Sequence, residues 1–312
     1  MGVFVFLPLV LPLTAWPVAR LAEQHLHPRT ATRLLTGVSG VMALCSTVCL
    51  GLVMVVGTAQ LPGNPLPDGW SDPEVREAVP YDEVVGKAAI PALVAVVVLC
   101  ARVLWRHGKV RRQVHRALAG LPGASEVAVL PDDTPYAYAV PGGERGGRVV
   151  VTTGLLGRLA SGERRALFAH ERAHLAARHH RFLLVTRLAA AANPFLLPLR
   201  TAVSYTTERW ADEEAARAVG DRRTVARAIG RAALAAHAVP WPTPAGLAAP
   251  GPVPRRVAAL LGPAPAARGR PSLFTAVGLA AWTAAAGTAV SAMSSANCTV
   301  TMVVILHGAT PL

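Results

Sequence analysis

The chain has 312 residues, of which 52% are hydrophobic, and a formal net charge of +13. Its mean hydropathy of +0.39, with long uncharged apolar runs at both ends, excludes a wholly soluble protein and favours a membrane protein with one soluble portion. The four cysteines do not form the pattern of a disulfide framework, and three of them lie in apolar runs where they are expected to pack as small hydrophobic residues.

Charge is distributed unevenly along the chain. Residues 1–99 have a net charge of −2, residues 100–270 have +15, and no Asp, Glu, Lys or Arg follows Arg270. A basic segment of this size is compatible with nucleic-acid binding. In a membrane protein, however, basic segments are those retained on the cytoplasmic side. We therefore expect no direct nucleic-acid binding and a cytoplasmic location for the basic segment.

Apolar stretches predict a mostly α membrane protein with about four transmembrane helices. Three of them, residues 3–19, 34–58 and 88–105, lie in an N-terminal membrane region (1–117), and the fourth covers 272–296. Loop 20–33 and the segment after the third span are basic, whereas loop 59–87 is acidic. This asymmetry predicts a multi-pass protein of the cell membrane with its soluble domain in the cytoplasm. Residues 297–312 are expected to be a short tail.

Residues 118–238 predict a small α+β domain. The runs Glu126–Leu130, Tyr136–Val140 and Arg148–Thr152 predict three short strands, the last two forming a hairpin. A short helix follows, and Ser161 is expected to cap a longer one. Asn193-Pro194 interrupts the helical pattern, and Gly220-Asp221 separates the last two helices. Six prolines in residues 239–254 predict an irregular tether there, within a Pro-rich linker over 239–271.

The helix expected after Ser161 contains His170-Glu171-x-x-His174. Positions i and i+4 lie on one face of a helix, so both imidazoles can reach one metal ion. Glu171 would then sit beside the metal, where it can take a proton from bound water. A zinc hydrolase needs a third protein ligand, and Glu208 on a following helix can provide it. Asp212, four residues further on, can accept a hydrogen bond from a ligand imidazole.

These residues predict a site for one Zn²⁺ ion and hydrolysis of a peptide bond. Zinc lowers the pKa of its bound water to about 7, and Glu171 would act as the base. The group that stabilises the oxyanion is left open between His180, Tyr205 and Arg209. An extended substrate could pair with an exposed edge of the 136–152 hairpin.

Three stretches resemble a known group of enzymes. Thr152-Thr-Gly-Leu-Leu, then Leu-Phe-Ala-His-Glu-Arg-Ala-His, then Glu208-x-x-Ala-Asp212 resemble membrane-bound gluzincin peptidases of the HtpX and CAAX prenyl protease type. The layout of three spans, a cytoplasmic domain and a fourth span resembles the BlaR/MecR antirepressor family, whose extended motif His180 also fits. The resemblance implies a gluzincin-like zinc peptidase domain that acts on a cytoplasmic or membrane-proximal protein, in the BlaR/MecR case with removal of a transcriptional repressor.

The sequence departs from the BlaR/MecR pattern in two ways. Ala211 stands where those relatives more often have Cys, and neither lysine follows a serine by three residues, so a penicillin-binding sensor is not expected.

Two functional classes remain open from the sequence. The first is a membrane-anchored zinc-dependent endopeptidase with a protein or peptide substrate, and the second is a catalytically silent membrane signal transducer that binds a cytoplasmic partner. An intramembrane protease is disfavoured because arginines flank the motif.

Overall fold

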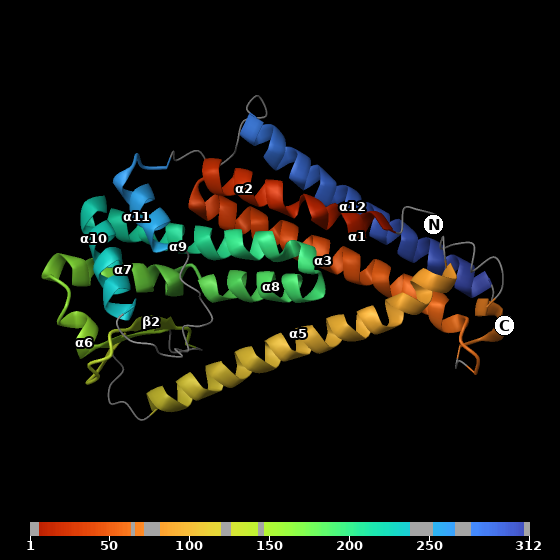
Figure 1. Cartoon of the computed structure of the whole chain (residues 1–312), viewed down its shortest axis with the longest axis horizontal. Helices are drawn as coiled ribbons and strands as arrows, with labels where there is room; N and C mark the ends of the chain where they lie inside the picture. Colours follow the sequence, from red (N-terminus) through yellow and green to blue (C-terminus); the bar gives the residue numbers. More distant parts are fainter. Residues whose placement is uncertain are drawn as a thin grey trace.

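A computed structural model describes residues 6–63, 66–71, 82–119, 126–142, 147–237, 252–265 and 276–308. The molecule is elongated, with long helices along its main axis and a small sheet with the motif helix at one end (Figure 1). The segregation follows from the sequence, because the apolar runs supply the long helices and the alternating or short runs supply the sheet.

Within the described residues, three helices are long and apolar enough to span a membrane, namely Pro28–Ala59, Val84–Ala117 and Trp282–Gly308. They belong to α3 (Pro28–Ala59), α5 (Asp82–Ala119) and α12 (Ala276–Gly308). α3 lies between the other two, and its Cys49 and Val53 pack in one buried cluster with Ala89 of α5 and Cys298 of α12. The cysteines therefore pack as small hydrophobic residues, and all four are free thiols.

α3 and α5 cross at two glycines. A Cβ built on Gly57 would lie 2.1 Å from the carbonyl carbon of Gly86, and a Cβ on Gly86 would lie 2.6 Å from Cα of Gly57. Only residues without a side chain allow the two backbones to approach this closely, as small residues do at helix crossings in membranes.

The first predicted span does not form one long helix. Its described part is divided into α1 (Leu7–Val10), the 3-10 turn η2 (Leu11–Thr14) and α2 (Ala15–His25). Pro8 and Pro12 lack the amide hydrogens of a continuous helix, which accounts for the interruption. Among the described residues, three rather than four helices therefore meet the length of a membrane span.

The other end of the chain is more helical than expected. α12 continues to Gly308, although residues 297–308 were predicted to belong to a short tail. These residues contain no charged side chain or proline that would end the helix, and Cys298 and Met302 are buried against α3.

The sheet contains β1 (Val127–Leu130), β2 (Ala137–Val140) and β3 (Arg148–Thr152) in the order β1-β3-β2. β2 and β3 pair antiparallel, as the hairpin prediction required, whereas β1 pairs parallel to β3. The central strand is the most buried, with Val149, Val150 and Val151 fully inaccessible to solvent. β2 is therefore left with one edge that no described strand covers.

The remaining helices are α6 (Thr153–Leu156), α7 (Ser161–Ala176), α8 (His179–Ala192), η4 (Pro194–Leu196), α9 (Leu197–Val219) and α10 (Arg222–His237), with a single turn η3 (Asp68–Ser71) between α3 and α5. Gly220 ends α9 with φ of 78°, and Asp221 accepts hydrogen bonds at the start of α10. The predicted cap of α7 is displaced by one residue. Ala160 is the N-cap, and its amide donates to Glu163 Oε2 at 2.8 Å, so Ser161 is already helical.

The predicted linker contains a helix, α11 (Val253–Leu261), although residues 238–251 and 266–275 lie outside the described part. Pro252 and Pro254 stand at its first turn, where a missing amide hydrogen costs nothing. Val257 and Leu260 pack against a buried cluster shared by α7, α9 and α10. Of the segment predicted to be irregular, 239–254, the structure describes only the last three residues, and two of these already belong to α11. The Pro-rich linker over 239–271 therefore contains a helix, because a short amphipathic segment within it has a surface to pack on.

Candidate metal centre

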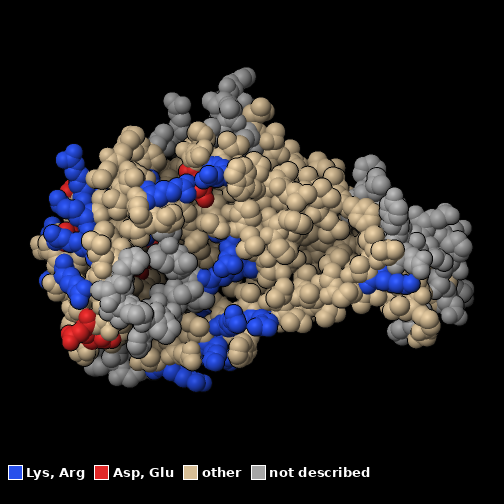
Figure 2. Space-filling view, in the orientation of Figure 1, with Lys and Arg blue, Asp and Glu red and all other residues tan. Residues whose placement is uncertain are grey.

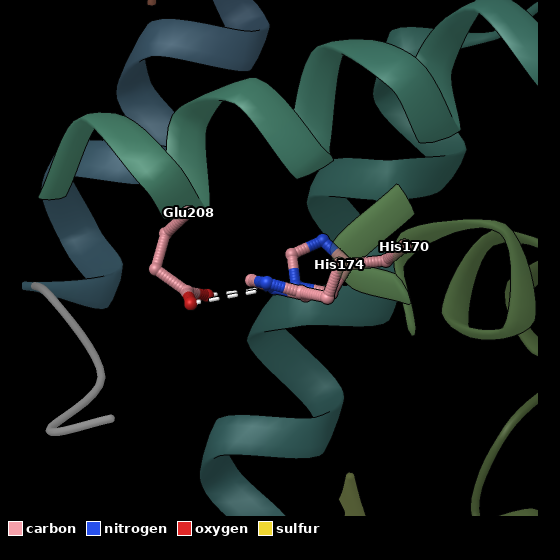
Figure 3. Close-up of side chains that lie close together, drawn as sticks. All are labelled: His170, His174 and Glu208. Atoms are coloured by element: carbon pink, nitrogen blue, oxygen red, sulfur yellow. Dashed lines mark hydrogen bonds and ion pairs between the residues drawn. The ribbon is translucent and has the colours of Figure 1, made fainter. Parts of the chain in front are cut away.

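Three side chains from two helices converge at one point. His170 and His174 project from α7 and Glu208 from α9, and Figure 3 shows the three side chains pointing toward one another. Their ligand groups form a triangle, in which the two imidazole nitrogens lie close to different oxygens of the Glu208 carboxylate. Nε2 of His170 lies 3.1 Å from Nε2 of His174 and 3.5 Å from Oε2 of Glu208, and Nε2 of His174 lies 3.4 Å from Oε1 of Glu208.

This triangle fits a zinc ion. Tetrahedral coordination with bonds of 2.0–2.1 Å separates any two ligand atoms by about 3.3 Å. Two imidazole nitrogens and one carboxylate oxygen also form a ligand set that zinc uses in hydrolases, with a fourth position left for water. The residues present would therefore hold a single Zn²⁺ ion, and no other group of three such side chains was found in the described part of the chain.

Glu171 lies next to these ligands on α7 and is itself buried. Its carboxylate accepts a hydrogen bond from the backbone amide of Ala139, on the uncovered edge strand β2. Burial raises the pKa of Glu171 above its ordinary value, which brings the carboxylate closer to the proton affinity that a general base needs near neutral pH.

Asp212 lies one turn beyond Glu208 on α9 and is completely buried. Its Oδ1 is 3.0 Å from Nδ1 of His170, an ion-pair distance that is not aligned as a hydrogen bond. When Nε2 of a histidine binds a metal, Nδ1 carries the hydrogen, so a carboxylate at this position favours the tautomer that binds metal.

Arg256 was not recognised in the sequence, yet it holds two of the three acidic residues of the site, Glu208 and Asp212. Its guanidinium, buried on α11, donates from Nε to Oδ2 of Asp212 at 2.9 Å and from Nη2 to Oδ1 at 2.6 Å. Nη1 lies 2.9 Å from Oε2 of Glu208. The only sequence signal was the position of Arg255-Arg256 in a proline-rich stretch, which gives no indication that α11 packs on α9.

His179 was also missed. The helix that carries the motif ends just before this residue, and the sequence did not predict an end there. Arg178 adopts a left-handed conformation with φ of 53°, so α7 ends at Ala176 and α8 begins at His179. The turn brings Nδ1 of His179 to 2.9 Å from Nδ1 of His174. The other face of the imidazole lies against Trp210 of α9, with ring centres 4.6 Å apart. His179 therefore lies beside Nδ1 of His174 in the same way that Asp212 lies beside Nδ1 of His170.

The electrostatics of the site differ between the two ligand histidines. Burial opposes the charged form of His170, but its contacts with Asp212 and Glu208 outweigh burial and raise its pKa to about 10. Burial lowers the pKa of His174 to about 4. Burial also opposes ionisation of Glu208, but the charge of Arg256 outweighs it and holds the pKa of Glu208 well below the ordinary value. The carboxylate is therefore ionised and able to bind a cation.

The three residues considered for oxyanion stabilisation have neighbours other than the metal ligands. The charges that act on His180 include Arg181 of α8 and His107 and Arg111 of α5. The ring of Tyr205 is covered by the guanidinium of Arg255 at 4.1 Å, and Nη1 of Arg209 lies 3.0 Å from Oε1 of Glu213. None of the described contacts of these residues involves the ligand atoms, so no oxyanion role is assigned to them.

A helix-borne His-Glu-x-x-His pair completed by a glutamate from a later helix defines the metallopeptidase class. Residues 101–188 match the profile described as Peptidase family M48. That segment ends before Glu208, so the third ligand rests on the geometry of α9. Over this part of the chain, the match agrees with the class predicted from the sequence, a metallopeptidase.

One curated relative is similar over part of its length. Protease HtpX of Hydrogenovibrio crunogenus is 31% identical to this chain over 105 residues, which is 34% of either protein. The matched region therefore spans about a third of that relative. No solved structure matches the chain.

Proposed function

We propose that the chain is a membrane-anchored zinc endopeptidase that cleaves a protein substrate. The observation that carries the proposal is the triangle of Nε2 of His170, Nε2 of His174 and the carboxylate of Glu208. The two nitrogens are 3.1 Å apart, and each lies 3.4–3.5 Å from a different carboxylate oxygen. Glu171 lies beside this triangle, and the matched peptidase profile covers the helix on which it stands.

The residues of the chain divide the work as follows. His170, His174 and Glu208 would hold the ion, which polarises the scissile carbonyl and lowers the pKa of bound water. Glu171 takes a proton from the attacking water and delivers it to the leaving amine. Asp212 and His179 keep the two imidazoles in the metal-binding tautomer, and Arg256 fixes the carboxylates of Glu208 and Asp212.

An extended substrate would add to the uncovered edge of β2. β2 lies at the edge of the sheet, and its Ala139 amide contacts Glu171. A peptide that pairs with this strand would be recognised by backbone hydrogen bonds and brought close to the base. This mode places few demands on side chains, so we expect broad sequence tolerance.

We further propose that the peptidase domain faces the cytoplasm, because the basic segment after the third apolar stretch and the acidic loop before it follow the charge rule for membrane topology. A substrate on that side is either a soluble protein, such as the transcriptional repressor implied by the BlaR/MecR resemblance, or a membrane protein.

The competing function is a silent transducer that binds a partner without cleaving it. The two are separated by comparing purified wild type and Glu171→Gln on a fluorescein-labelled unstructured protein. Loss of cleavage of about a hundredfold or more, with zinc content unchanged, supports the peptidase. Equal cleavage by the variant, or no zinc-dependent cleavage by the wild type, would overturn it. Glu214→Gln, on α9 but bonded to Trp210, is the matched control.

A further inference from the structure

The boundary of the membrane on α5 is marked by an aromatic residue. Trp105 is 59% exposed at the end of an exposed apolar surface that includes Val97 and Leu104. Nζ of Lys109, one turn later, lies 5.3 Å from the centre of the Trp105 ring. Tryptophan followed by lysine at the end of an apolar helix is typical of the level of lipid headgroups. The part of α5 that follows Trp105 therefore lies at that level.

α8 lies alongside α5 at this boundary. Sγ of Cys100 on α5 contacts the carbonyl oxygen of Leu188 on α8 at 3.8 Å. The charges of Arg111 and Arg187 act on His107, and those of Arg181, His107 and Arg111 act on His180. Five side chains from the two helices thus form one group, the α5–α8 basic cluster: His107, Arg111, His180, Arg181 and Arg187. Figure 2 shows Lys and Arg gathered where α8 faces α5, next to a long uncharged surface.

No acidic side chain balances this cluster. In the part of the chain that the structure describes, no carboxylate lies within ion-pairing distance of any of its five residues. Arg187 is half-buried, and burial together with the charge of Arg200 lowers the pKa of its guanidinium. Arg111 and Arg181 are exposed, so the half-buried guanidinium of Arg187 is the cation whose burial an anion would offset most.

We propose that the α5–α8 basic cluster binds the phosphate of an anionic phospholipid headgroup, with the acyl chains lying along the exposed apolar face of α5. Both requirements of such a ligand are met in one place, since the cations lie at headgroup level and the apolar surface continues directly from them. Val185 of α8 is a further exposed apolar residue, 39% exposed. A soluble acidic partner would match the charges but leave the apolar face unused.

The test measures bound lipid in the full chain and does not depend on catalysis. Glu171→Gln protein is purified in a mild detergent and incubated with phosphatidylglycerol or with phosphatidylcholine of the same acyl chains, and bound lipid is counted by native mass spectrometry. Arg111→Gln/Arg187→Gln is compared with Arg158→Gln/Arg165→Gln, which removes the same charge from exposed sites near α6 and α7. Equal melting temperatures of the two variants show that both fold.

We expect phosphatidylglycerol to be retained in preference to phosphatidylcholine by the parent and the control, and roughly tenfold more weakly by Arg111→Gln/Arg187→Gln. Equal retention by both variants would overturn the proposal. An excess of inorganic phosphate distinguishes the two sources of the anion. Complete displacement of the lipid by phosphate alone would show a site for a free anion and would also overturn it. Zinc content and cleavage are read separately, so failure here leaves the peptidase proposal untouched.

Discussion

Arg256 and Asp212 form a buried bidentate pair, with Nε donating to Oδ2 at 2.9 Å and Nη2 to Oδ1 at 2.6 Å. The pair joins α11, which follows a proline-rich stretch, to the helix that supplies the third metal ligand. Because the same guanidinium also contacts Glu208, one side chain fixes the two carboxylates that α9 contributes to the site. α11, which lies in a stretch predicted to be a Pro-rich linker, thus completes the metal centre.

The first prediction concerns this pair. Arg256→Gln leaves two buried carboxylates without their countercharge. We therefore expect the free energy of unfolding of the metal-free protein to fall by about 3–5 kcal/mol. We also expect zinc affinity about 10–100-fold weaker. Thermal unfolding and competition with a chelator measure the two effects. Arg255→Gln is the control, since Arg255 contacts Glu23 and Tyr205 instead of the ligands. Equal effects of the two variants would contradict the account.

The second prediction concerns His179. His174 donates from Nδ1 to Nδ1 of His179 when its Nε2 binds a metal. His179→Leu removes the acceptor and should weaken zinc binding by about tenfold or more. His179→Asn places an amide oxygen near the lost nitrogen and should recover part of the affinity. His180→Asn, at the adjacent position, should have little effect. If His179→Leu and His179→Asn bind zinc equally, His179 does not accept a hydrogen bond from His174 and has no role in the site.

The third prediction is a pH dependence of metal binding. The pKa of His170 in the metal-free protein is about 10, so below that pH a proton competes with the ion for Nε2. The apparent affinity for zinc should therefore rise up to about tenfold per pH unit between pH 6.5 and pH 9. Asp212→Asn removes a principal cause of the raised pKa and should give a shallower slope. A wild-type affinity that levels off just above pH 6.5 would indicate an ordinary histidine.

The fourth prediction tests the crossing of α3 and α5. Gly57→Ala places a methyl group against the backbone of Gly86, so the two helices must separate. We expect the free energy of unfolding to fall by about 1–3 kcal/mol. Gly51→Ala, on α3 with no atom within 4 Å of the added Cβ, should be neutral or slightly stabilising. Thermal unfolding in detergent compares the two. Equal melting temperatures would show that the crossing is looser than the structure has it.

Much of the fold could be predicted because it depends on local patterns. The strands, the break at Asn193-Pro194 and the end of α9 at Gly220 follow from alternation, proline and left-handed glycine. Three of the four spans predicted from apolar runs correspond to helices long enough to cross a membrane, but the interruption near Pro8 and Pro12 depends on how the broken segment packs against its neighbours.

The same distinction between local pattern and tertiary packing applies to the residues of the metal site. His170, His174 and Glu208 could be proposed because helical spacing and a ligand count restrict the choice, and the structure brings these three together. Arg256 and His179 could not, because each reaches the site through tertiary structure. Arg256 arrives from a helix inside a proline-rich stretch, and His179 is turned back by the left-handed Arg178.

The central claim is that His170, His174 and Glu208 together hold one zinc ion. The most direct measurement is the zinc content of the purified full-length protein for the wild type, Glu208→Ala and the control Glu214→Ala, on the same helix. The account predicts about one zinc per chain in the wild type and the control, and about a tenth of that or less in Glu208→Ala. Stoichiometric zinc in Glu208→Ala would contradict it and place the third ligand elsewhere.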